Sequence, residues 1–227
     1  MSAIATPLPR LTRHDLRVAV PLYTLGEAAR YLDLPPSTLH DWARPKDAPP
    51  LITVLPKHGH FPSLPFIGFA EAFVIKAAVD AGVPPVRIRP GIEKIKEKAG
   101  GIEHALASRV VYTDGAELLL DTIDDEDLDV ARTDQRTFRK AVESKLRLIT
   151  FGTDGDTFAE RIRLPRYAHV HVVVDPRFAS GKPIVEEGLA PRVKDLVDRV
   201  RGGDDPQAVA RDFKIPLTHV EEIVRNA

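Results

Sequence analysis

Apolar residues recur at helical spacing in two short segments near the start of the chain. The first segment begins with Thr24 and Glu27, whose spacing is that of a capping box at a helix start. Its apolar residues share one face and are Leu25, Ala28, Ala29 and Leu32. Residues 33–35 are too few for anything but a tight turn, and Leu39 and Trp42 then give a second helix its apolar face. The pattern predicts a helix-turn-helix.

Prolines interrupt residues 45–66, which excludes a helix there but permits a short hairpin. We expect its two arms at 51–55 and 60–61, where they would form a wing beside the helix-turn-helix. Residues 67–81 are apolar at helical spacing, and this is the most buried helix that the sequence predicts. A further helix with regular apolar positions follows at 86–98.

From residue 108 onward the apolar period shortens from that of helices to that of strands. The predicted strands lie at 110–112, 118–120, 148–151, 162–164 and 169–174, the first two joined at Asp114-Gly115. The predicted helices lie at 134–146, 192–200, 206–213 and 218–226. Asp205 is expected to cap the third of these helices, and Thr218 with Glu221 forms a capping box for the fourth.

These elements predict an α+β chain. We expect a winged helix-turn-helix, linking helices, a small β-rich middle and a C-terminal three-helix, homeodomain-like domain. The corresponding boundaries are 20–66, 67–107, 108–175 and 176–227.

The apolar residues of 67–81 cover more than one face of their helix, which is excessive for a lone surface helix. One interpretation is a homodimer formed through this helix, because operators read by helix-turn-helix proteins are commonly two-fold symmetric. The other is that the helix packs inside the monomer.

Charge and composition narrow the class of protein. The formal net charge is −1, so any affinity for nucleic acid must come from local basic clusters. Acidic residues cluster at 121–129. The absence of cysteine excludes disulfides and fits a reducing cytosol. The sequence contains no signal peptide and no apolar run near the roughly 20 residues that span a bilayer. We therefore expect a cytoplasmic protein that is not inserted in a membrane.

The second helix of the helix-turn-helix supplies candidate DNA contacts. Ser37, Thr38 and His40 remain on its outer side, where short polar residues can approach base edges in the major groove. Cationic side chains at its end and in the preceding arm are candidates for phosphate contacts. These residues are Arg44, Arg10, Arg13 and Arg17.

Two His-x-His pairs are candidate metal ligands: His58 with His60, and His169 with His171. In a strand, each pair would point to one face, as in some zinc sites. The spacing fixes no third ligand, and the chain has no phosphate-binding glycine loop and no nucleophile elbow. We expect no metal, no cofactor and no catalysis; a metal-dependent enzyme that uses these pairs is kept as an alternative.

The two ends of the chain resemble known families. Residues 23–42 and the proline-rich stretch after them resemble the N-terminal winged helix of MerR-type regulators, although Asp41 and His40 make the second helix less basic than usual. The C-terminal part is similar to the "domain of unknown function 433". The matching residues are Asp175, Pro176, Gly181, Pro183, Ile184, Gly202 or Gly203, Val209 and Ala210. The family's usual glycine-threonine-arginine run is replaced here by residues 187–191.

The order of these parts, with residues 66–89 between them, looks like that of the mycobacterial VapB-type antitoxins. This resemblance implies two activities: neutralising a PIN-domain ribonuclease and binding the promoter of its own operon. Two alternatives remain: a MerR-like regulator whose C-terminal half senses a small molecule, and the enzyme mentioned above.

The resemblance also implies a nuclease partner that holds a metal between carboxylates. Arginine is suited to pair with such ligands because its planar fork matches a carboxylate. The candidate toxin-binding residues are Lys182 beside the Gly181–Pro183 bend, Arg192 at a helix start and Arg225 near the C-terminal end.

Overall fold

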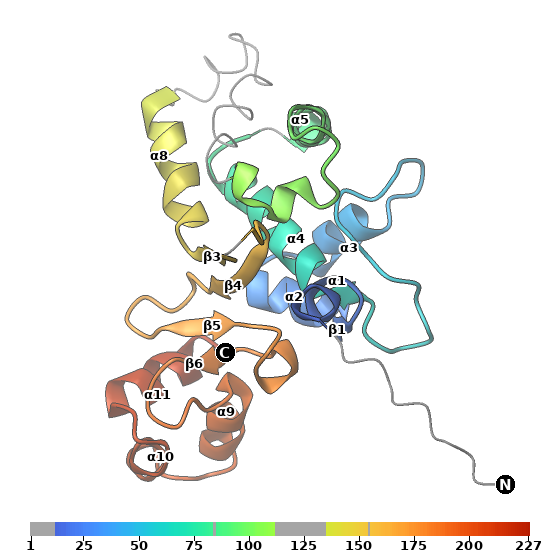
Figure 1. The fold of residues 1–227 in the computed structure, drawn as a ribbon. Helices are drawn as coiled ribbons and strands as arrows, with labels where there is room; N and C mark the ends of the chain where they lie inside the picture. The colour runs from blue at the N-terminus through green and yellow to red at the C-terminus, as the bar shows by residue number, and fades with distance from the viewer. Residues whose placement is uncertain (1–11, 84, 112–134, 154) are drawn as a thin grey trace, which may run out of the picture.

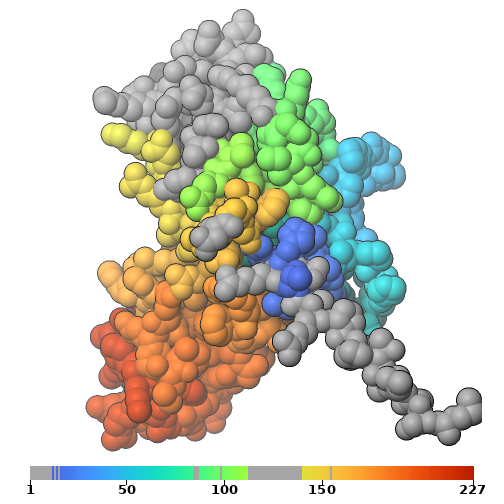
Figure 2. All heavy atoms as spheres, in the orientation of Figure 1, coloured from blue at the N-terminus to red at the C-terminus, as the bar shows by residue number. Residues whose placement is uncertain are grey.

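The computed structural model describes residues 12–83, 85–111, 135–153 and 155–227. It confirms the α+β class, with helices in the N-terminal and C-terminal parts and a small antiparallel sheet between them (Figure 1). The C-terminal residues gather at one end of the molecule (Figure 2). The hairpin expected around Asp114-Gly115 lies outside the described residues. Val110 and Val111, expected at the start of its first strand, are helical.

The helix-turn-helix is present where the sequence predicts it. Its helices are α2, Leu25–Leu32, and α3, Pro36–Ala43; they follow α1, Arg13–Val18, and β1, Pro21–Tyr23. The predicted capping box is formed, since the Thr24 hydroxyl accepts from the Glu27 amide and the Glu27 carboxylate accepts from the Thr24 amide. Asp33 takes a left-handed conformation with φ 55°, which ends α2 and turns the chain into α3.

The wing differs from the expected hairpin. Residues 51–63 form a loop with no strand, and its base is closed where the Leu55 amide donates to the Ser63 carbonyl at 2.8 Å. Prolines 56 and 62 flank the tip and lack the amide donors that a strand ladder needs. The strand pairing formed instead joins β1 to β2, Leu64–Pro65, in an antiparallel two-stranded sheet.

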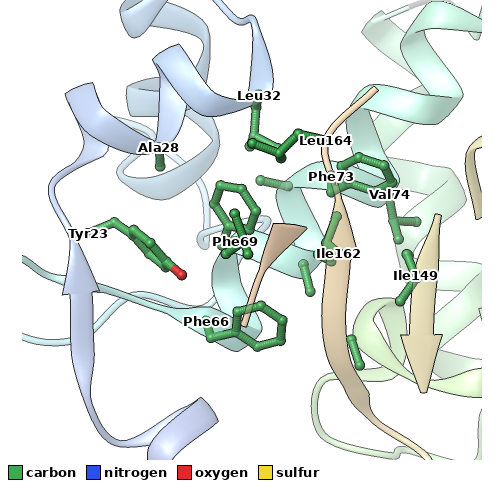
Figure 3. Close-up of a cluster of buried hydrophobic side chains, with 14 of the residues drawn as sticks. Tyr23, Ala28, Leu32, Phe66, Phe69, Phe73, Val74, Ile149, Ile162 and Leu164 are labelled. Atoms are coloured by element: carbon green, nitrogen blue, oxygen red, sulfur yellow. The ribbon is translucent and has the colours of Figure 1, made fainter. Parts of the chain in front are cut away.

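Helix α4, Phe66–Asp80, runs through the middle of the core. Its aromatic side chains lie between Tyr23 and α2 on one side and the strands that carry Ile162 and Ile149 on the other (Figure 3). Because nearly every residue of α4 is buried within the chain, this helix leaves only its last turn open, which is too little for an interface. The dimer interface expected on residues 67–81 is therefore wrong: the excess apolar surface packs inside the monomer.

Three further helical elements surround α4: α5, Pro85–Lys98; the 3-10 turn η1, Ala105–Ala107; and α8, Gln135–Leu146. Four strands follow, namely β3, Ile149–Phe151; β4, Ala159–Arg163; β5, Val172–Val174; and β6, Ile184–Val185. They form one antiparallel sheet in the order β3-β4-β5-β6. The sequence did not predict β6, and its pairing with β5 carries the sheet across the domain boundary expected at residue 175.

The C-terminal lobe contains three short helices packed on one another. After the 3-10 turn η2, Ala179–Gly181, these are α9, Val193–Arg201; α10, Pro206–Phe213; and α11, Leu217–Arg225. Asp205 caps α10 as predicted, through the Gln207 amide. The capping box expected at Thr218 is wrong, because α11 begins one residue earlier at Leu217, with Pro216 at the N-cap and no side-chain cap.

Candidate nucleic-acid interface

The outer face of α3 is polar and open to solvent. Ser37 and His40 are exposed and Thr38 is half-buried, whereas Leu39 and Ala43 are fully buried and fix the helix against the core. Pro36 stands at the first position of the helix, where a missing amide costs nothing. Of the three predicted base-reading residues, Ser37 and His40 are therefore accessible and Thr38 is partly accessible.

Arg44 follows α3 and lies beside the wing. Its Nη2 donates to the Leu55 carbonyl at 3.4 Å, and the side chain is half-buried. This hydrogen bond uses one of the five N–H donors of the guanidinium, so others remain for another acceptor. Arg44 thus lies between the end of α3 and the base of the wing.

The tip of the wing is a group of candidate DNA contacts that sequence reasoning missed. Lys57, His58, His60 and Phe61 are all exposed, and Phe61 is 74% exposed. Gly59, at φ 57°, turns the chain so that the Phe61 amide donates to the His58 carbonyl. The sequence predicts a wing here but names no DNA contact in it; the signal is a basic and aromatic run between Pro56 and Pro62.

Arg17 does not lie in an exposed arm. It is 3% exposed, and its Nη1 donates to the carbonyl of Ala159 at 3.3 Å. Its Nη2 forms an ion pair with Asp156. Burial alone would raise the pKa of Asp156, but the Arg17 guanidinium and the Phe158 amide outweigh burial and hold this pKa below its ordinary value. A phosphate contact by Arg17 is therefore excluded in this structure, where the side chain fixes α1 to the sheet.

Arg10 and Arg13 are the other two residues of the arm that were expected to contact phosphates. Arg10 lies outside the described residues. Arg13 is the first residue of α1, and its backbone alone is described.

Among the candidate toxin-binding residues, Lys182 faces the helix-turn-helix rather than solvent. Its Nζ donates to Glu27 Oε1 at 2.9 Å and to the Leu22 carbonyl at 3.1 Å. Beside it, the hydroxyl of the buried Tyr23 donates to the Gly181 carbonyl at 2.9 Å. These contacts join the C-terminal bend to the start of α2.

The ion pair with Lys182 changes the ionisation of Glu27. Burial by itself would raise the pKa of this carboxyl group, but hydrogen bonds from the Thr24 amide and the Lys182 ammonium outweigh it, and the pKa is lowered. Glu27 is therefore a carboxylate near neutral pH. In that form it caps α2 and binds Lys182 at the same time.

The remaining two toxin-binding candidates differ in whether they form an ion pair within the chain. Arg192 forms a two-pronged pair with Asp195 at 2.8 Å for each hydrogen bond. Arg225, at the end of α11, is exposed and forms no ion pair with any described residue. The structure does not bring these three cations together into one patch, because only Lys182 and Arg192 border the same cavity.

Neither histidine pair forms a metal site in the described part of the chain. His58, His60, His169 and His171 are all exposed, and no group of three or more potential ligands occurs among the described residues. The described helices also include none that is long and apolar enough to cross a membrane.

Comparison with known proteins agrees with this arrangement. Residues 21–92, which span the helix-turn-helix, the wing and α4, match a family model described as "Putative DNA-binding HTH domain". Over 223 residues the chain is 42% identical to "Putative antitoxin VapB45" of Mycobacterium tuberculosis, covering 88% of this chain and 91% of that protein. The crystal structure of Rv2018 from the same organism superposes with a TM-score of 0.77 at 38% identity, covering 92% of this chain and 99% of that one. The protein therefore belongs to the VapB-type antitoxin family and carries its DNA-binding helix-turn-helix at the N-terminal end.

Proposed function

We propose that this protein is the antitoxin of a type II toxin-antitoxin pair, which neutralises a PIN-domain ribonuclease and binds the promoter of its own operon. The observation that carries the proposal is that the helix-turn-helix and the C-terminal lobe are joined by side-chain contacts within one chain. A helix-turn-helix with an accessible α3 is tied to the C-terminal lobe through Lys182 with Glu27 and Tyr23 with Gly181. One molecule can thus hold DNA on α3 and a partner protein on the C-terminal lobe.

For the DNA-binding activity, we propose that Ser37, Thr38 and His40 read base edges and that Arg44 contacts a phosphate. The exposed wing tip, with Lys57, adds a second contact beside the groove. A two-fold operator would require two copies of the chain. Because α4 is buried, such a dimer must use another surface.

The test is binding of the full-length protein to a labelled fragment of its own promoter. The double variant Ser37→Ala/Thr38→Ala should lose preference for the promoter over unrelated DNA while keeping its nonspecific binding. Arg211→Ala, which removes an exposed cation from α10, is the matched control and should bind as the wild type does. An unchanged preference in the double variant would contradict the assignment of α3.

For neutralisation, we propose that Arg225 is the cation that enters the nuclease site. Lys182 and Arg192 would first have to release Glu27 and Asp195, whereas Arg225 needs no such exchange. Its guanidinium can pair with the metal-binding carboxylates expected of a PIN-type nuclease. Its place at the end of the last helix leaves it room to insert into a cleft.

This activity is tested by co-purification with the ribonuclease of the neighbouring gene and by inhibition of its RNA cleavage. Arg225→Glu should abolish inhibition, because it replaces the cation with a charge that repels the metal ligands. Arg211→Glu makes the same change in charge at another exposed position and should inhibit normally. Full inhibition by Arg225→Glu would move the assignment to Lys182 or Arg192.

A further inference from the structure

A cavity of about 520 Å³ lies between the first helix of the helix-turn-helix and the C-terminal lobe. One wall is α2, which contributes Arg30 and Tyr31, and the opposite wall is α9. Arg166 and Tyr167, on the connection between β4 and β5, border it as well. Its volume falls within the range of sites that hold small molecules, roughly 300–1,000 Å³.

The side chains around this cavity carry an excess of positive charge. Among the described residues, six cations border it, namely Arg30, Arg166, Lys182, Arg192, Lys194 and Arg201, against the carboxylates of Glu27, Asp198 and the terminal residue Ala227. Cations gathered around one concave site attract a ligand with more than one negative charge.

Two of these cations are available to a ligand. The Arg30 guanidinium forms no hydrogen bond or ion pair with any described residue. Arg166 donates a single long hydrogen bond, 3.4 Å, to the Arg30 carbonyl. By contrast, Lys182 and Lys194 are already paired with Glu27 and Asp198. Arg192 is paired with Asp195, and Arg201 donates to the carbonyl of Ala227. Arg30 and Arg166 therefore hold unused donors in the planar arrangement that matches a phosphate group.

The rest of the lining is apolar or aromatic, and includes Leu164, Val197 and the two tyrosines. Such a surface suits a flat or apolar group attached to the anion. Burial raises the pKa of Tyr31 to about 12, so its hydroxyl remains a neutral hydrogen-bond donor near neutral pH.

We propose that this cavity binds a small phosphorylated molecule with a ring, of the nucleotide class, whose phosphates are held by Arg30 and Arg166. The site lies at the junction of the two ends of the protein and is separate from the face of α3. It goes beyond the proposed antitoxin function and does not depend on it.

The direct test is calorimetric titration of the full-length protein at low ionic strength with three probes: ADP, pyrophosphate and adenosine. We expect ADP to bind about tenfold more tightly than either fragment, because only ADP engages both the cations and the apolar wall. Pyrophosphate binding as tightly as ADP, or no binding of ADP at millimolar concentration, would overturn the proposal.

Arg30→Ala/Arg166→Ala should weaken ADP binding about tenfold or more, because it removes the two guanidinium groups that hold the phosphates. The control Arg147→Ala/Arg211→Ala removes two exposed arginines away from the cavity and should leave ADP binding unchanged. If the first double variant instead bound ADP normally but lost affinity for promoter DNA or for the ribonuclease, the cluster would be a macromolecular contact and the nucleotide site would be wrong.

Discussion

Lys182 donates a hydrogen bond to Glu27 across 155 residues of sequence, with 2.9 Å between Nζ and Oε1. Glu27 also accepts from the Thr24 amide at the start of α2. A single carboxylate thus caps the first helix of the DNA-binding motif and ties that helix to the C-terminal bend. The stability of the helix-turn-helix and its attachment to the lobe therefore depend on the same charge.

We predict that Glu27→Gln lowers the free energy of unfolding by about 1 kcal/mol at pH 7, since it weakens a cap and a partly exposed ion pair together. The lowered pKa of Glu27 means that this stabilisation is present above the ordinary carboxyl pKa and is lost as the pH falls through the lowered value. Urea unfolding should show the gap between wild type and variant closing below about pH 4.

Lys182→Met is the companion to that variant, because it removes the ion pair and leaves the cap intact. It should cost less than Glu27→Gln at pH 7. Equal costs for the two variants would mean that the cap contributes no more than the hydrogen bond from Lys182 to the Leu22 carbonyl, which is lost only in Lys182→Met.

We predict that Gly181→Ala destabilises the protein by about 2–3 kcal/mol. Gly181 has φ 72°, and a Cβ built there would lie 2.5 Å from the Tyr23 hydroxyl oxygen. The substitution therefore combines backbone strain with displacement of a fully buried ring. Thermal unfolding measures the loss.

Gly203→Ala separates the two causes. Gly203 also has a left-handed φ, 103°, but a Cβ there would meet nothing within 4 Å. It should cost only about 1 kcal/mol. If both glycine variants lost the same stability, contact with Tyr23 would not contribute.

The sequence predicted those elements whose signals are local. The capping box of Thr24 and Glu27, the apolar run of α4 and the Asp205 cap are each written within a few neighbouring residues, and the structure confirms them. Strand β6 has only two residues, Ile184 and Val185, and forms because β5 lies beside it, so no periodicity could reveal it.

In the candidate site, too, only the local features could be predicted. Leu39 marks the buried face of α3, and helical periodicity then predicts that Ser37 and His40 are exposed on the other side. The burial of Arg17 could not be read from its basic neighbours, because its partner Asp156 lies 139 residues away in sequence. The cavity bordered by Arg30 and Arg166 likewise depends on contacts between distant segments.

We predict that Arg44→Ala weakens binding to every DNA sequence alike. Loss of one phosphate contact should lower the slope of log affinity against log salt by about one unit. Electrophoretic shifts over a range of salt concentrations measure this slope. Wild-type affinity and slope in the variant would show that Arg44 serves only its hydrogen bond to Leu55.

Thr38→Ala should act differently from Arg44→Ala, because we propose that Thr38 reads a base edge and that Arg44 contacts a phosphate. We expect a changed preference among operator sequences, with a loss of about 1–3 kcal/mol at the base pair it contacts and an unchanged salt slope. Binding to a library of single-base operator variants measures this preference. A uniform loss of affinity across the library would show that Thr38 contacts the DNA backbone instead of a base.

Arg17→Met should lower the stability of the protein and leave the salt dependence of DNA binding unchanged, the opposite of what is expected for a phosphate-binding arginine. The variant leaves Asp156 without its cation and the Ala159 carbonyl without its donor, so we predict a loss of about 2–3 kcal/mol in the free energy of unfolding. Because Arg17 is buried, the salt slope of DNA binding by the folded protein should stay at the wild-type value. Urea unfolding and salt titration on the same preparation separate the two effects. A stable variant with a lower salt slope would place Arg17 on the DNA and contradict its role in holding α1 to the sheet.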